Sequence, residues 1–174
     1  MHRKNQPWRR AFTLIELIAA IVVFSLVSMV FAGIMLESAE AYASASEARE
    51  RGERASLAMD RIVRMIREVP ENEAAPGTPD ITDASATALE LGNGAAVRLS
   101  GSTLILIVPD APAPAVLCTE VSAFELTYLG QDGMELALGA GDTTADIHRI
   151  NVRLACGQIE LRTSAFLRVA LGGG

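Results

Sequence analysis

The sequence is poor in lysine and histidine, and both shortages exclude classes of function. Its one lysine, Lys4, and its net charge of −6 argue against a nucleic-acid surface, which needs clustered basic side chains. Neither His2 nor His148 stands in a pattern with cysteines that is typical of a zinc site. His148 alone would have to support a Ser-His-Asp arrangement, and its neighbours Ile147 and Ile150 predict an ordinary strand position. The sequence therefore predicts no catalytic residue, no metal site, no cofactor and no enzyme.

Charge and proline are absent from one long stretch near the start of the chain. Residues 17–36 contain no charged side chain, no proline and a single glycine. As a helix this stretch would be about 30 Å long, enough to cross the apolar core of a bilayer. Basic residues precede it, whereas Glu37 and Glu40 follow it. The positive-inside rule therefore predicts a cytoplasmic N-terminus and a body on the far side of the membrane.

Glu16 stands at the start of this apolar run, where a carboxylate is tolerated only if it reaches the interface or finds a partner. Two common export signals do not account for it. A secretory signal peptide cleaved after Ala45 would have a shorter apolar run, and Glu37 and Glu40 lie between the run and that site. A twin-arginine signal at residues 9–10 would be disrupted by Glu16 so close behind it.

Residues 12–17 read Phe-Thr-Leu-Ile-Glu-Leu and follow two arginines and Ala11. This arrangement resembles the class III signal of type IV pilins and type II secretion pseudopilins. The resemblance implies that residues 1–11 are a leader, that a prepilin peptidase cuts between Ala11 and Phe12, and that Phe12 is then N-methylated. Ala11 replaces the glycine that is usual in the family. Because alanine is the closest substitute in size, we expect processing to survive.

The resemblance also implies a role for Glu16 in assembly. Cleavage would give Phe12 an α-amino group that is largely protonated near neutral pH. We hypothesise that the Glu16 carboxylate of one subunit neutralises the Phe12 ammonium of a neighbour inside a filament. Neither charge is then left unpaired in surroundings of low dielectric constant. Four of the 15 basic residues lie in the leader, so the mature chain would carry 11 basic and 21 acidic residues, a net charge of −10.

The helix is predicted to continue well beyond the apolar run. From Ser38 to Val69 there is no proline, and Gly52 is the only weak point before Pro70. Apolar residues at three- and four-residue steps predict that this second half packs on a core. This apolar stripe consists of Ala55, Ala58, Met59, Ile62, Val63, Ile66 and Val69. Acid-base pairs four residues apart are expected at Glu47–Arg51, Glu50–Arg54 and Asp60–Arg64.

Beyond Pro70 the patterns are those of strands and turns. Alternating or apolar segments predict strands at 88–91, 95–99, 103–108, 124–128, 134–138 and 150–154. After the turn at Gly157, the strand pattern continues with Ile159, Leu161 and then residues 166–169. The glycines at 92 and 94 predict a hairpin turn between the first two strands. Residues 70–85 are expected to be a linker, and residues 109–118 and 139–146 are expected to be loops.

Two cysteines and a group of acidic residues in this part are candidate sites. Cys118 and Cys156 are an even pair in the part predicted to be exported, which favours a disulfide in an oxidising periplasm. The alternative is that both are small buried apolar side chains. Asp142 and Asp146, with Asp132, could bind calcium as some major pseudopilins do in a β-loop, but their spacing is irregular for that purpose.

Together these features predict an α+β, pilin-like fold in which a long N-terminal helix packs on an antiparallel β-sheet domain. The expected parts are a leader (1–11), a transmembrane and assembly half of the helix (12–36), an amphipathic half (37–69) and a periplasmic β domain (70–174). The strand pattern most resembles the minor J-type pseudopilins and W-type minor pilins.

That resemblance implies a structural subunit that initiates or caps a type II secretion pseudopilus or a type IV pilus. Its expected partners are the prepilin peptidase and other minor and major pilins or pseudopilins, in a hetero-oligomeric filament. Its expected place is the inner membrane, with a single span, before it enters the filament. The alternative is a membrane-tethered periplasmic binding domain that never assembles.

Overall fold

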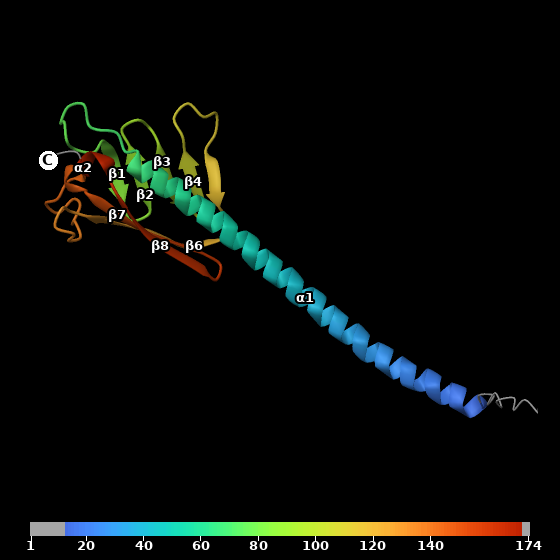
Figure 1. Ribbon diagram of the computed structural model, residues 1–174. Helices are drawn as coiled ribbons and strands as arrows, with labels where there is room; N and C mark the ends of the chain where they lie inside the picture. The colour runs from blue at the N-terminus through green and yellow to red at the C-terminus, as the bar shows by residue number, and fades with distance from the viewer. Residues whose placement is uncertain (1–12, 172–174) are drawn as a thin grey trace, which may run out of the picture. The chain divides into compact units, whose positions relative to one another are not determined.

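A computed structural model describes residues 13–171 of the chain. It contains one long helix, α1 (Leu14–Arg67), followed by eight strands, a single 3₁₀ turn, η1 (Thr144–Asp146), and a short helix, α2 (Arg168–Leu171) (Figure 1). α1 ends at Arg67, short of the predicted end at Val69, because Pro70 disfavours helical backbone in the residue before it. The chain divides into two compact units that meet in sequence at Glu47 and Ala48.

The first unit holds the beginning of α1, and its side chains from Thr13 to Glu47 are all exposed. Among the described helices, α1 is long and apolar enough to cross a membrane. Ser25 Oγ donates a hydrogen bond of 2.8 Å to the carbonyl oxygen of Ile21, four residues earlier. The helix backbone therefore satisfies this hydroxyl, which needs no partner in apolar surroundings.

The second unit begins with the remaining part of α1, and the predicted apolar stripe is confirmed. Its buried residues are Ala55, Ala58, Met59, Ile62 and Ile66, with Val69 buried just beyond the helix and Val63 partly buried. Gly52 lies close to β8 (Ile159–Phe166): a Cβ added at Gly52 would be 3.3 Å from Cδ1 of Ile159. A larger residue at Gly52 would therefore require Ile159 to shift, which gives this weak helix former a packing role.

The ion pairs on α1 agree in part with the pairs predicted from the sequence. Arg54 contacts Glu50 at 2.6 Å, as predicted, and Arg49 contacts Glu53 at 3.0 Å. The predicted pair of Asp60 and Arg64 is wrong, because these two residues form no ion pair in the described part of the chain. Sequence spacing permits such a pair but does not fix the rotamers of two long exposed side chains, which lose entropy on pairing.

Five strands form one antiparallel sheet in the order β1-β2-β3-β4-β5 (Figure 1). They are β1 (Ile81–Ser85), β2 (Ala88–Leu91), β3 (Ala96–Ser100), β4 (Thr103–Ile107) and β5 (Ala115–Cys118). The predicted β2–β3 hairpin is confirmed, with Gly94 at a positive φ of 81° in its turn. The expected linker at 70–85 and loop at 109–118 are wrong at their ends, which form β1 and β5. Both strands are short and pair at the edges of the sheet, so apolar alternation marks them weakly.

Three longer strands form the second antiparallel sheet, in the order β6-β7-β8. β6 (Val121–Leu129) pairs with β7 (Arg149–Cys156), and β7 pairs with β8. The predicted alternation in β7 is confirmed, since Ile150, Val152 and Leu154 are buried. β8 ends at Phe166 and is followed by α2, so the strand predicted up to Val169 is too long.

The strand predicted at 134–138 is wrong. Only one bridge, between Leu129 and Glu135, joins this segment to β6. Leu136 N also donates to Tyr128 O of β6 at 2.9 Å, but aspartate side chains bind two other amides of the segment: Met134 N donates to Asp132 Oδ1 at 2.9 Å, and Ala137 N donates to Asp142 Oδ2 at 2.7 Å. Aspartate competes in this way with sheet pairing and favours turns.

One apolar core joins the second part of α1 to both sheets. In the described residues, no polar or charged side chain is buried in it. β6 also contacts the turns of the other sheet, because Leu126 N donates to Ala86 O at 2.8 Å and Val121 N donates to Ser102 O at 2.9 Å. The hydroxyl of Tyr128 donates to Ser85 O at 2.8 Å, and its burial raises the pKa of this phenol. These bonds fix the two sheets to each other.

Candidate assembly site at the start of the helix

α1 begins with a capping box formed by Thr13 and Glu16. Glu16 Oε2 accepts hydrogen bonds from Thr13 N and Thr13 Oγ1, each 2.9 Å long, and Glu16 N donates to Thr13 Oγ1 at 3.4 Å. The box satisfies amides that the first turn of a helix leaves without partners. The pattern Thr-x-x-Glu ahead of an apolar run is typical of a helix start. The capping box could therefore have been predicted from the sequence, although the sequence analysis assigned Glu16 a role in assembly alone.

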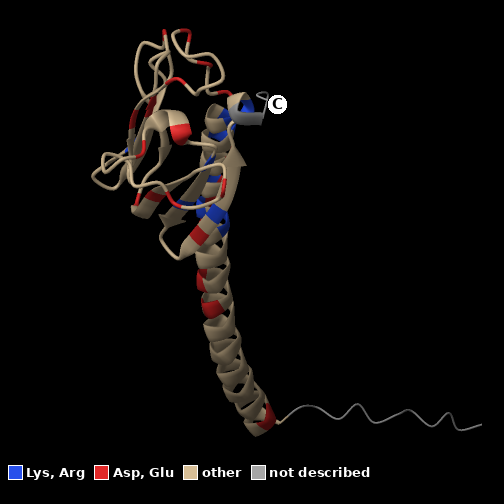
Figure 2. Cartoon of the chain, turned by 90° about the vertical axis from the view of Figure 1, so that its left-hand side faces the viewer, with Lys and Arg blue, Asp and Glu red and all other residues tan. Residues whose placement is uncertain are grey.

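The Glu16 carboxylate keeps one oxygen outside the capping box. Oε1 has no hydrogen bond or ion pair with any described residue, and the side chain is exposed. The next charged residue along α1 is Glu37, and Figure 2 shows the uncharged stretch between them. Ala11 and Phe12, which were predicted to flank the cleavage site, lie outside the described residues. Glu16 is thus an exposed acceptor at one end of an uncharged stretch of helix.

Residues 9–32 match the family model described as the prokaryotic N-terminal methylation motif. The chain carries this methylation motif. The match includes Glu16 and most of the apolar run, and the motif together with α1 fits a membrane-anchored, type IV pilin-like protein. One long N-terminal helix followed by antiparallel sheets confirms the predicted α+β, pilin-like fold. No curated protein matches the chain.

The two cysteines lie outside the methylation motif in the sequence, at the ends of two strands. Cys118 ends β5 and Cys156 ends β7, so they belong to different sheets. Both are buried free thiols, and their Sγ atoms are 2.6 Å apart. Burial, and then the hydrogen bond with Cys118, raise the pKa of the Cys156 thiol above its usual range. The structure therefore brings together the pair that was predicted from the sequence.

Three aspartates of the β6–β7 connection bind the backbone of their own loop. Asp132 and Asp142 accept the amide bonds described above, and Asp146 Oδ2 accepts Thr143 N at 2.9 Å and Thr143 Oγ1 at 2.8 Å. These bonds lower the pKa of the Asp146 carboxyl group. Within residues 13–171, no group of three or more potential ligand side chains could hold a metal ion. These hydrogen bonds give the three aspartates a structural role in their loop.

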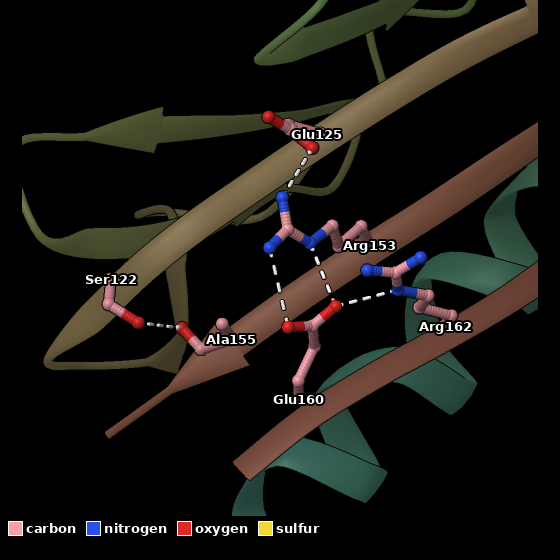
Figure 3. Close-up of polar contacts among 6 residues, drawn as sticks. All are labelled: Ser122, Glu125, Arg153, Ala155, Glu160 and Arg162. Carbon is pink, nitrogen blue, oxygen red and sulfur yellow. Dashed lines mark hydrogen bonds and ion pairs between the residues drawn. The ribbon is translucent and has the colours of Figure 1, made fainter. Parts of the chain in front are cut away.

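A charged ladder crosses the outer face of the β6-β7-β8 sheet, and the sequence did not predict it (Figure 3). Arg153 contacts Glu125 and Glu160, both at 2.9 Å, and Arg162 contacts Glu160 at 2.6 Å. The two arginines lower the pKa of the Glu160 carboxyl group to about 2. Because these side chains are partly exposed, each pair contributes little to stability. Strand register, which the sequence does not give directly, places the four residues together.

Proposed function

We propose that the protein is a minor pseudopilin or minor pilin, a non-enzymatic subunit that initiates or caps a type II secretion pseudopilus or a type IV pilus. The observation that carries the proposal is the methylation motif at residues 9–32, which places Glu16 at the start of an exposed apolar helix. Structural roles are typical of type IV pilin-like proteins. The mature chain would insert through residues 17–36, with its folded domain in the periplasm.

Processing is the first step of this proposal. A prepilin peptidase would cut between Ala11 and Phe12, and Phe12 would then be methylated. The test is an intact mass and an N-terminal sequence of the full chain from membranes of a host that has the peptidase. A methylated terminus at Phe12 is the expected result. A chain that still begins at Met1 would contradict processing despite the motif, and one that begins at Ser46 would indicate a secreted domain.

Glu16 would act in assembly through its charge. The capping box uses Oε2, which leaves Oε1 for the terminal ammonium of a neighbouring subunit. Thr13 would then hold the carboxylate in position and satisfy part of its hydrogen-bonding capacity, which reduces the cost of taking the charge into apolar surroundings. Because a glutamine also fits a capping box, the cap and the charge can be separated by mutation.

Glu16→Gln keeps a side chain that can cap Thr13 N and removes the charge, whereas Glu16→Ala removes both the capping side chain and the charge. We expect both variants to stay in the membrane and to lose incorporation into the filament. The measurement is the amount of the chain in sheared filament fractions relative to the amount in membranes. Glu37→Gln, at the other end of the uncharged stretch, is the matched control and should be incorporated normally. If Glu16→Gln is incorporated at the normal level, the charge of Glu16 has no role in assembly and only its capping of the helix remains.

The minor role is tested by the partners that the protein binds. Full-length chain in mild detergent should co-purify with sibling minor subunits from the same host. A membrane-tethered binding domain, the alternative function, should purify without them. A normal number of filaments when the chain is deleted would also contradict an initiating role, because a filament without its initiating subunit forms rarely.

We also propose a disulfide between Cys118 and Cys156 in the exported protein. The two thiols would lose two protons and two electrons to a protein disulfide of the periplasm, which would be reduced to a dithiol. The bond would join β5 to β7 and stabilise the domain by about 2–4 kcal/mol. Alkylation of the denatured protein without reductant should leave both cysteines unmodified. Alkylation of both would support the alternative, two buried thiols.

A further inference from the structure

A groove lies in the second unit between α1 and the five-stranded sheet. It has a volume of about 270 Å³ and lies beside the β2–β3 turn and the end of β4. Its apolar lining includes Met65, Leu106 and Val108, and Val108, which directly follows β4, is 46% exposed. The groove is therefore an apolar recess that is open to solvent.

Two arginines of α1 stand at this groove without ion-pair partners. Arg61 and Arg64 line it, and neither forms an ion pair with any residue between 13 and 171. Figure 2 shows arginines along this part of α1. Glu68 also lines the groove, so these three side chains carry a net charge of +1 in a chain whose net charge is −6. The chemistry of the groove fits an apolar side chain with carboxylates beside it.

The same chain presents such a group at the tip of the β6–β7 connection. Met134 is 68% exposed, more than any other large apolar side chain whose burial the structure describes in the second unit. Asp132 and Glu135 flank it, and Glu135 has no ion pair in the described part of the chain. Among the side chains of this unit with a described burial, the other exposed large apolar ones are Leu57, Val108, Val116 and Phe166, and none of these stands between two acidic neighbours in this way.

The loop holds Met134 in a fixed position. Met134 N donates to Asp132 Oδ1, Gly130 N donates to Met134 O at 2.9 Å, and Gly133 N donates to Gly130 O at 3.0 Å. Gly133 has a positive φ of 80°, which favours glycine. A side chain presented on a fixed turn loses little entropy on binding. The Met134 tip is thus a preorganised apolar knob between two carboxylates.

We propose that the groove at Arg61 and Arg64 binds the Met134 tip of a second copy of this chain. Met134 enters the apolar recess, while Asp132 and Glu135 face the two arginines. The two surfaces are different parts of the molecule, so the contact is heterologous: each copy offers a groove to one neighbour and a knob to another. Contacts of this type continue into rings or open helical filaments rather than closing as dimers.

The contact goes beyond the proposed function, because a subunit that starts or caps a filament needs no contact with its own kind. One knob in one groove buries less area than a stable complex in solution requires. Copies confined to one membrane meet at a much higher effective concentration, which favours a weak contact. The test therefore uses the full chain in membranes.

The experiment joins the two surfaces with engineered cysteines. A chain that carries both Met134→Cys and Val108→Cys is oxidised in membranes with copper phenanthroline and separated without reductant. We expect a ladder of dimers, trimers and higher multiples, because every copy supplies both halves of the contact. Met134→Cys combined with Val116→Cys, an exposed position on β5 outside the groove, is the matched control and should give no ladder. An equal ladder from the control pair, or no ladder from the test pair, would overturn the contact.

Charge reversal tests the arginines separately. Adding Arg61→Glu and Arg64→Glu to the test pair should lower the yield of the ladder by roughly threefold to tenfold. Adding Glu135→Arg as well should restore part of it. Arg98→Glu, on β3, should leave the ladder unchanged. A ladder that is insensitive to all these changes would overturn the proposed recognition. Because no secretion machinery takes part, a negative result leaves the proposed role in a mixed filament standing.

Discussion

The two parts of α1 share one helical backbone, but the first part exposes its apolar side chains whereas the second part buries an apolar stripe. Up to Glu47 every described side chain is exposed, although the sequence from residue 17 to 36 is almost wholly apolar. After Ala48 the apolar residues form a stripe, and that stripe is buried in the core. Apolar content alone therefore does not decide burial within the chain. The periodicity of the apolar residues does, because only a one-sided stripe fits a single core.

The largest expected effect is on the free energy of unfolding, when one isoleucine in each part of α1 is replaced by alanine. Ile62 is fully buried and Ile21 is 58% exposed. Ile62→Ala should lower the free energy of unfolding of the β domain by about 2–5 kcal/mol, because it leaves a cavity. Ile21→Ala should change it by less than about 0.5 kcal/mol. Urea unfolding of the full chain in detergent, followed by tyrosine fluorescence, measures both. Equal losses would mean that the first part of α1 also packs on the domain.

The next prediction tests whether exposed leucines in the two parts of α1 are surrounded by lipid or by water. Leu26 is 61% exposed and Leu57 is 64% exposed, so the chain itself shields them equally. Leu26→Arg should oppose membrane insertion by about 2.5–3.5 kcal/mol, and Leu57→Arg should not affect insertion. Resistance to alkaline carbonate extraction is the measurement. If both variants remain equally membrane-bound, the apolar run does not lie in the bilayer core.

The smallest effect concerns the exposed ladder on the outer face of the second sheet. The pKa of Glu160 is about 2 in the folded chain and has an ordinary value of 4.5. Its stabilising contribution is therefore present above pH 4.5 and is lost as the pH falls from there to about 2. The unfolding temperature of the wild type should fall slightly more over this range than that of Glu160→Gln. Glu135→Gln, which removes a carboxylate without an ion pair, should behave like the wild type.

Much of the fold could be predicted because its signals are local. The stripe from Ala55 to Val69 has helical spacing, and the alternation of Ile150, Val152 and Leu154 fixes the inner face of β7. The segment at 134–138 looks like a strand, but two of its amides, those of Met134 and Ala137, bind Asp132 and Asp142, a competition that apolar patterning does not register. β1 has one buried residue, Ile81, so its pairing depends on β2 rather than on its own sequence.

The candidate sites also include some features that the sequence predicts and others that it does not. The position of Glu16 follows from the motif and the apolar run, and its bond to Thr13 follows from a four-residue pattern. The approach of Cys118 to Cys156 depends on how two sheets meet across 38 residues of sequence, which no local pattern reports. The groove at Arg61 and Arg64 likewise needs the packing of α1 beside the β2–β3 turn.

The bonds from β6 to the turns of the other sheet have a consequence for solubility. At nine residues β6 is the longest strand of the described chain, and only one of its edges is paired with β7. A long open edge is a template on which a strand from another molecule can add, and such addition leads to aggregation. Ala86 and Ser102 supply carbonyl oxygens to the amides of Leu126 and Val121 on that open edge. The turns of one sheet thus cover part of the open edge of the other, which disfavours the extension of β6 into an intermolecular sheet when copies of the chain are crowded.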